Sequence, residues 1–217
     1  MKPITKLNSY VFALTTSVVY YLWDSLSLIS IKSPIWSYIA IFIFSAGFYK
    51  GMYKILFVIC NHFQYLKKIL LGKSFFEGTW IGFYQYKDKI RLYYEICDQT
   101  IGDCSIYGRS FDLDGNHISS WTIVDPYVNV EKSQFSYFYE INDSSSSDFY
   151  MGFANSTIIY DKHNKAYRLD GFAVDRDDSS KQSFISIKES DNSSKYVNNQ
   201  KYLLERAREV YKNQNLF

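Results

Sequence analysis

Residues 78–97 read GTWIGFYQYKDKIRLYYEIC, and this stretch decides the fold class. Aromatic and branched side chains recur in it at every second position, which is the period of a β-strand. Lys87 and Asp88 interrupt the pattern in the middle and predict a two-residue hairpin turn. The stretch therefore predicts two antiparallel strands, at residues 78–86 and 89–97.

The same period of two continues along most of the remaining chain. Polar turn signals separate six further runs, at residues 104–111, 117–124, 134–141, 148–160, 165–174 and 182–188. Eight short strands with no helical run between them predict a small antiparallel sandwich or up-and-down barrel, and we expect a barrel. Residues 198–213 have helical spacing and predict a C-terminal helix that packs on the barrel or caps it.

The first third of the chain has a different composition. Residues 1–74 carry a net charge of +7 and the remainder carries −5, which together give the +2 of the whole chain. Residues 10–29 and 35–49 are apolar runs of roughly the length that crosses a bilayer. We therefore expect a transmembrane helical hairpin with a juxtamembrane helix at residues 1–74, and a β-barrel sensing domain at 75–217. A cleaved signal peptide and a buried hairpin of a soluble protein are the alternatives.

Lysines flank both apolar runs. Only Lys32 lies in their connection, and the other lysines of this part precede the first run or follow the second: Lys2, Lys6, Lys50, Lys54, Lys67, Lys68 and Lys73. Cytoplasmic loops of membrane proteins carry an excess of basic residues. We therefore expect a multi-pass protein of the bacterial inner membrane with both termini, and hence the barrel, in the cytoplasm.

The sequence contains no signature of a catalytic site: it has no P-loop, GxSxG, HExxH or CxxC motif. Its three cysteines are an odd number without regular spacing and its three histidines are scattered, which argues against a disulfide framework and a metal site. Most carboxylates lie in turns, where Asp accepts local hydrogen bonds. We therefore expect a binding protein with no cofactor, no metal and no catalytic residues, rather than an enzyme.

The first hairpin has two unlike faces, because residues that oppose each other across a hairpin share a face. The mixed face carries Trp80, Gly82, Tyr84, Arg91, Tyr93 and Glu95. The apolar face carries Ile81, Phe83, Ile90, Leu92, Tyr94 and Ile96. Aromatic rings beside a cation suit a nucleobase and its phosphate. Which face turns into the barrel stays open, since simple burial favours the apolar face and a Gly-x-Trp opening usually turns its Trp inward.

Arginine is scarce, and three arginines lie in the expected strands: Arg91, Arg109 and Arg168. An acidic domain that binds an anion needs a local basic spot, so these three are candidates, although each also suits a surface ion pair. Trp121 is either a core residue or a stacking platform. The predicted ligand-binding residues are Tyr84, Tyr86, Arg91, Tyr93, Arg109, Trp121 and Arg168.

Residues 76–86, FEGTWIGFYQY, follow two apolar runs, and a later Tyr107-Gly108-Arg109-Ser110 strand and Asp114-Gly115 turn fit the same pattern. This arrangement resembles the membrane-anchored β-barrel effectors of bacterial CBASS anti-phage systems, the CD-NTase-associated family with an N-terminal transmembrane pair. The Gly-x-Trp opening also resembles that of lipocalins and other small barrels.

The resemblance to CBASS effectors implies a function. A partner nucleotidyltransferase makes a cyclic dinucleotide upon phage infection, and the barrel binds it. Binding promotes homo-oligomerisation, and the transmembrane segments then disrupt the inner membrane and kill the infected cell. The expected partners are thus a cyclic dinucleotide, the lipid bilayer and further copies of this chain, and not a nucleic-acid polymer.

Other readings remain open at this point: a membrane-tethered, lipocalin-like carrier of an apolar small molecule, a scaffold whose barrel binds protein, or an enzyme. The residues that line the barrel cavity would distinguish a lipid carrier from an anion-binding protein. A cavity lined by Ile81, Phe83 and Leu92 would indicate a lipid carrier. An anion site is instead expected to place at least one of the three strand arginines beside Tyr84 or Tyr93.

Overall fold

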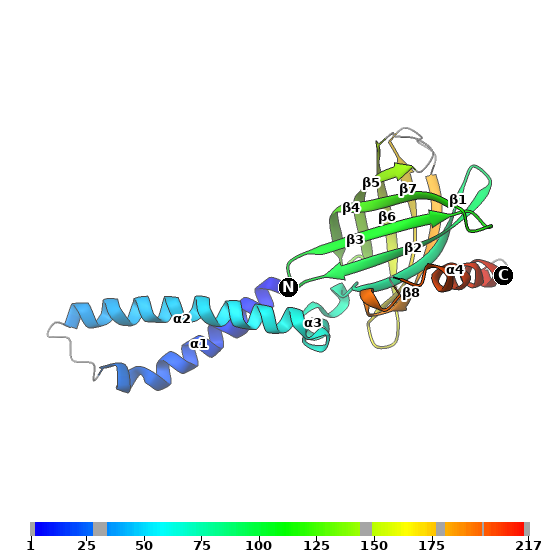
Figure 1. Ribbon diagram of the computed structural model, residues 1–217. Coiled ribbons are helices and arrows are strands. Elements are labelled where there is room, and N and C mark those ends of the chain that lie inside the picture. The colour runs from blue at the N-terminus through cyan, green and yellow to red at the C-terminus, as the bar shows by residue number, and fades with distance from the viewer. Residues whose placement is uncertain (1–2, 28–33, 144–148, 177–180, 197, 215–217) are drawn as a thin grey trace. The chain divides into compact units, whose positions relative to one another are not determined.

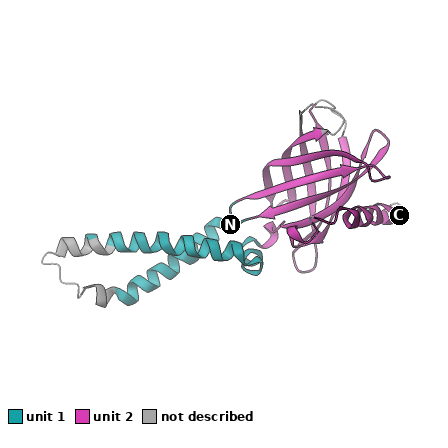
Figure 2. Ribbon diagram, in the orientation of Figure 1, with its two compact units in different colours: residues 1–71, 100–102 teal, residues 72–99, 103–217 magenta. Residues whose placement is uncertain are grey.

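The structure is a computed structural model, and it describes residues 3–27, 34–143, 149–176, 181–196 and 198–214. The chain divides into two compact units (Figure 2). One unit is helical and comprises Met1–Leu71 with Thr100–Gly102. The other comprises Gly72–Gln99 and Asp103–Phe217 and contains all the strands.

The helical unit is built from three helices, α1 (Pro3–Ser27), α2 (Pro34–His62) and α3 (Gln64–Leu71). A small apolar core holds it together, formed by Leu7, Val11, Cys60, Leu70 and Ile101. The backbone N–H of Ile101 also donates a hydrogen bond to Asn61 Oδ1 at 2.8 Å. The short segment around Ile101 therefore belongs to this unit, although it connects two strands of the barrel.

Of the two predicted membrane spans, the structure supports one. Within the described residues, a single segment, Phe42–His62 of α2, is long and apolar enough to cross a membrane. It begins inside the second predicted run and continues past Lys50 and Lys54, because α2 does not end at Tyr49. Residues 28–33, whose Lys32 entered the predicted orientation, lie outside the described residues.

Helix α1 is less apolar than α2. Hydroxyl groups recur along it, and those of Ser9 and Ser17 donate to the carbonyl oxygens of Thr5 and Ala13 at 3.0 and 2.9 Å. Such back-bonding satisfies a hydroxyl inside a helix. It does not remove the polarity that lowers the hydropathy of the segment.

The second unit is a closed, antiparallel, eight-stranded barrel in which each strand pairs with its neighbours in sequence and β8 pairs with β1 (Figure 1). This confirms the predicted barrel and its C-terminal helix. The strands are β1 (Gly78–Tyr86), β2 (Lys89–Gln99), β3 (Cys104–Phe111), β4 (His117–Asn129), β5 (Gln134–Asp143), β6 (Phe149–Tyr160), β7 (Ala166–Asp175) and β8 (Lys181–Ser190).

The first hairpin has the predicted register. Lys87 and Asp88 have φ angles of 46° and 62°, as a two-residue turn that follows the twist of the strands requires. Tyr84 pairs with Arg91, and the pairs continue in register to the start of β1. Strand β4, in contrast, runs beyond the predicted end at Val124, because a bulge at Asp125 (φ 50°) shifts its register and lets pairing resume.

One end of the barrel is filled with aromatic rings. Phe76 stacks on Trp80 and on Phe135, with ring centroids 5.8 and 4.9 Å apart. The Gln99 side chain fixes the chain entering this end, because its Oε1 accepts from the Phe76 N–H at 2.7 Å and its Nε2 donates to the Ser74 carbonyl at 2.8 Å. Any interior space therefore lies toward the other end, where β1 turns into β2.

Helix α4 (Gln200–Gln214) covers part of the outer barrel surface (Figure 1). Its apolar side chains pack on outward-facing residues of β1, β2 and β3; the buried members of this layer are Leu203, Leu204, Ala207, Val210, Ile81, Leu92, Tyr94 and Phe111. Arg206 forms an ion pair with Glu189 at 3.2 Å. The helix thus supplies a second apolar core outside the barrel.

Candidate functional site

The first hairpin turns its mixed face into the barrel. Tyr84, Tyr93 and Glu95 line an interior cavity. Ile81 and Leu92, from the other face, are fully buried on the outside, beneath α4. The apolar face therefore has its cover outside the barrel, and both faces satisfy the tendency of apolar surface to be buried. This decides the question that the sequence left open.

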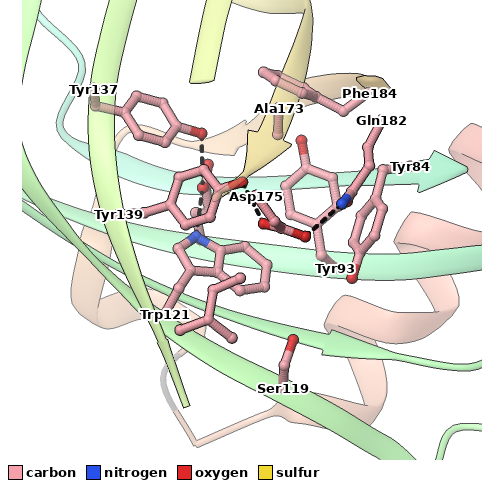
Figure 3. A pocket seen from close by; sticks show the side chains of 12 residues that line it. Tyr84, Tyr93, Ser119, Trp121, Tyr137, Tyr139, Ala173, Asp175, Gln182 and Phe184 are labelled. Atoms are coloured by element: carbon pink, nitrogen blue, oxygen red, sulfur yellow. Dashed lines mark hydrogen bonds between the residues drawn. The ribbon is translucent and has the colours of Figure 1, made fainter. Parts of the chain in front are cut away.

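The cavity lies toward the barrel end that carries the β1–β2 turn. Its volume is about 60 Å³. Figure 3 shows the side chains around it. They are Tyr84, Tyr93, Glu95, Ser119, Trp121, Tyr137, Tyr139, Ile141, Ala173, Asp175, Gln182 and Phe184. Half are aromatic, none is basic, and two are acids.

Glu95 lies seven residues after Asp88 of the turn along β2, two residues deeper than Tyr93. It is only 4% exposed. Its Oε1 accepts hydrogen bonds from Trp121 Nε1 at 3.0 Å and from the Tyr137 hydroxyl at 3.4 Å. Burial raises the pKa of the Glu95 carboxyl to about 7, although both hydrogen bonds act to lower it. Its charge is therefore sensitive to pH near neutrality.

Asp175 lies nearer the mouth, at the end of β7. Figure 3 shows its carboxylate between Tyr139 and Gln182. Asp175 Oδ1 accepts from the Tyr139 hydroxyl at 2.7 Å, and Oδ2 accepts from Gln182 Nε2 at 2.6 Å. Burial, and then the nearby Asp175 charge, raise the pKa of Tyr139 far above its usual value, so its hydroxyl remains a donor. Both Asp175 oxygens thus serve to hold the cavity wall.

Two of the cavity rings lie over glycines of neighbouring strands. Trp121 pairs with Gly108, and Tyr139 pairs with Gly152. A Cβ atom on Gly108 would lie 2.1 Å from Trp121 Cε2, and one on Gly152 would lie 2.2 Å from Tyr139 Cζ. Such approaches are not possible for a side chain, so these glycines are what allow the two rings to lie against the barrel wall.

The structure brings three of the seven predicted residues into the cavity: Tyr84, Trp121 and Tyr93. Trp121 is thus part of the cavity wall, and its ring centroid lies 5.8 Å from that of Tyr93. Arg91 lies opposite Tyr84 on the inward face of the hairpin, and Tyr86 lies two residues closer to the turn; neither lines the cavity, so we place both at its rim.

Arg109 and Arg168 do not belong to this site. Arg109 pairs with the outward-facing Tyr94, and its guanidinium lies 5.4 Å from the ring centroid of Tyr107. Arg168 forms an ion pair with Asp170 at 2.6 Å, also on the outer face. The reason is strand alternation: each arginine neighbours an inward position in sequence and therefore points outward. Neither arginine therefore lines the cavity that Tyr84 and Tyr93 share, contrary to the expected grouping.

The prediction missed most of the remaining lining, above all Glu95, Tyr137, Tyr139 and Asp175. Glu95 was assigned to the correct face but not to the site. In β5, the inward residues Tyr137 and Tyr139 alternate with Phe138, which is 51% exposed. Because aromatic residues occupy both faces of β5, composition could not separate them. The available signal for an inward position was a glycine opposite an aromatic residue on the neighbouring strand, as in the pairs Gly108–Trp121 and Gly152–Tyr139.

The described residues contain no group of three His, Cys, Asp or Glu side chains arranged to hold a metal ion. Comparison with protein-family models and with curated proteins gives no match for this chain.

Proposed function

We propose that this chain is a membrane-anchored sensor and effector of anti-phage defence. Its barrel binds a cyclic dinucleotide made by a partner nucleotidyltransferase, and binding drives oligomerisation and disruption of the bacterial inner membrane. The observation that carries the proposal is the aromatic cavity, which opens at one end of an otherwise closed barrel. In this account the chain is a binding protein and not an enzyme.

The cavity has the surface that a nucleobase needs. Tyr93 is central to it, with ring centroids of Tyr84 and Trp121 at 6.0 and 5.8 Å. Bases stack on such rings with a gain of about 1–3 kcal/mol each. The cavity volume, about 60 Å³, is below the usual range for small-molecule sites, so only part of a ligand would fit inside it. In our proposal one base enters the cavity while the sugar and phosphate stay at the mouth.

The rim provides a cation for the phosphate. Arg91 lies two residues closer to the turn than Tyr93, on the same inward face. Arg91 is also the cross-strand partner of Tyr84, so the two side chains share one face of the hairpin. Lys89 follows at the turn, opposite Tyr86. Arginine can bind a phosphate with two parallel hydrogen bonds, so this rim is a suitable place for it.

The helical unit supports attachment to a membrane. Phe42–His62 of α2 has the length and composition of a span. Our proposal adds α1 as a second span with both termini in the cytoplasm, so that the barrel meets a cytoplasmic messenger. A ligand that stabilises contact between barrels would shift the population toward assembled chains, and assembly gathers the spans needed to disrupt the bilayer.

A lipocalin-like carrier fits the cavity less well. Its expected lining residues, Ile81, Phe83 and Leu92, belong to the apolar layer with α4 outside the barrel. The cavity instead contains the acids Glu95 and Asp175. Placing an acyl chain against these groups would bury them without water, which is costly. The lining therefore favours a polar aromatic ligand over a lipid.

The proposal can be tested with the full-length protein in lipid vesicles that contain a trapped fluorescent dye. Cyclic dinucleotides of different base composition are added, and their binding is measured in parallel. We expect one or more to bind and to release the dye, and the corresponding linear mononucleotides to release none. Binding without dye release would overturn the effector part of the proposal. Absence of binding by every cyclic dinucleotide would overturn the sensor part.

A further inference from the structure

Glu95 offers an unused hydrogen-bond acceptor to the cavity. Its Oε1 takes the donors of Trp121 and Tyr137, at 3.0 and 3.4 Å. No hydrogen bond from any described residue reaches its Oε2, and no described Lys, Arg or His forms an ion pair with it. A carboxylate that is 4% exposed and has one oxygen without a partner calls for a donor from elsewhere.

The strongest donors of the lining are already engaged. The indole N–H of Trp121 is used by Glu95, and the Gln182 amide is used by Asp175. The Tyr139 hydroxyl also donates to Asp175. What remains for a ligand at the depth of Glu95 is an acceptor flanked by aromatic rings. The group that enters must therefore be flat, able to stack, and rich in N–H donors on its leading edge.

Nucleobases differ in this respect. The Watson–Crick edge of guanine carries two adjacent donors, the ring N1–H and the exocyclic 2-amino group. Adenine and cytosine place a ring-nitrogen acceptor beside their amino group, and uracil has a single N–H between two carbonyl oxygens. An acceptor set against a buried carboxylate is repelled and leaves both groups unpaired, and mismatches of this kind reject a ligand strongly.

We infer that Glu95 reads the Watson–Crick edge of a guanine, so that the barrel selects cyclic dinucleotides that contain guanine. Oε2 accepts from N1–H and the 2-amino group, while Trp121 and Tyr137 hold the carboxylate in place through Oε1. This inference rests on the proposed function. It specifies that the base at the inner end of the ligand is a guanine.

The test is calorimetric titration of the full-length protein in detergent with cyclic di-GMP, cyclic di-AMP and cyclic di-IMP. Inosine differs from guanine only in lacking the 2-amino group. We expect cyclic di-GMP to bind at least about tenfold more tightly than cyclic di-IMP, and cyclic di-AMP to bind more weakly still. Glu95→Gln should bring cyclic di-GMP and cyclic di-IMP to within a few-fold of each other, because the single amide oxygen stays with the Trp121 and Tyr137 donors and the amide nitrogen, itself a donor, faces the guanine.

A matched control is Glu140→Gln. Glu140 lies on β5 between the inward-facing Tyr139 and Ile141, so it points outward. We expect this variant to keep the full preference for guanine. If Glu95→Gln does not fold, the comparison of the inosine and guanine ligands on the unaltered protein still decides the matter.

The outcomes separate the two proposals. Equal binding of cyclic di-GMP and cyclic di-IMP, or tighter binding of cyclic di-AMP, would overturn the guanine assignment and leave the cyclic-dinucleotide sensor standing. An undiminished guanine preference in a folded Glu95→Gln protein would also overturn the assignment. If none of the three ligands binds, and mixed or pyrimidine-containing cyclic dinucleotides do not bind either, the sensor proposal fails and this inference fails with it.

Discussion

Trp121 Nε1 donates a hydrogen bond to Glu95 Oε1 at 3.0 Å, inside the barrel and two strands away. The bond joins the largest ring of the cavity to a deeply buried acid. It fixes the plane of the indole and the direction of the carboxylate at the same time.

Trp121→Phe removes the donor while keeping an aromatic ring. Since burial raises the pKa of Glu95 to about 7, its carboxyl is ionised at pH 8 and protonated at pH 5. We expect the free energy of unfolding to fall by about 1–3 kcal/mol at pH 8, because a buried charge loses a partner, and by less at pH 5. Urea unfolding followed by circular dichroism measures both. Tyr167→Phe, at an exposed outward ring, is the control. An equal loss at both pH values would mean that ring packing alone accounts for the effect.

Glu95 should also make stability depend on pH. Its pKa is about 7 in the folded protein, compared with the usual 4.5. The folded state therefore binds more protons over this interval, and the contribution of Glu95 to stability is complete below about pH 4.5 and lost as the pH rises through about 7. Two and a half pKa units correspond to roughly 3 kcal/mol.

The measurement compares unfolding free energies of the native protein and Glu95→Gln between pH 4.5 and 8. We expect the native protein to lose roughly 3 kcal/mol relative to the variant over this range. Asp112 and Asp161, whose pKa values are lowered by hydrogen bonds, act in the opposite direction but are present in both proteins and cancel. A difference that stays constant with pH would show that Glu95 titrates normally.

Gly108→Ala tests whether the glycine beneath Trp121 shapes the cavity. The new Cβ would lie 2.1 Å from Trp121 Cε2, so the indole must move. We expect a loss of about 1–3 kcal/mol in unfolding free energy and a clear loss of ligand binding. Gly47→Ala in α2, where a Cβ meets no atom within 4 Å, should leave ligand binding unchanged. Full binding by Gly108→Ala would mean that the indole position is not critical.

Arg91→Ala tests the rim. If the phosphate is bound there, we expect affinity for a cyclic dinucleotide to fall about tenfold to a hundredfold, as loss of a hydrogen bond to a charged group does. Arg91→Lys should recover part of this, and the contribution should weaken at high salt. Arg109→Ala is the matched control, because its guanidinium packs on Tyr107 outside the barrel. Equal effects of Arg91→Ala and Arg109→Ala would place the phosphate elsewhere.

The sequence was most informative where structure is local. The Lys87-Asp88 turn fixed the register of the first hairpin, and with it the pairing of Trp80 with Glu95. Nearby residues do not determine which face of that hairpin turns into the barrel. It is decided by α4, whose Leu203 and Ala207 lie more than a hundred residues further along the chain and cover the apolar face from outside.

The arginines illustrate the same limit. Arg109 and Arg168 were proposed from their scarcity and their place in strands, but a strand turns alternate residues to opposite sides. Which side is inside is set only when the barrel closes. Gly108 and Leu169, their neighbours in sequence, occupy the inward positions. Charge alone therefore could not identify the site, whereas the pairing of Gly108 with Trp121 could have indicated the interior.

The central claim is that the barrel cavity is the ligand site, and filling it tests this most directly. Ala173 lines the cavity, and Val174 is its outward-facing neighbour on β7. Calorimetry would compare binding of the cyclic dinucleotides to the full-length native protein, Ala173→Leu and Val174→Leu. The account predicts binding to the native protein and to Val174→Leu, and its loss in a folded Ala173→Leu. Unchanged binding by Ala173→Leu, or no binding by the native protein, would contradict it.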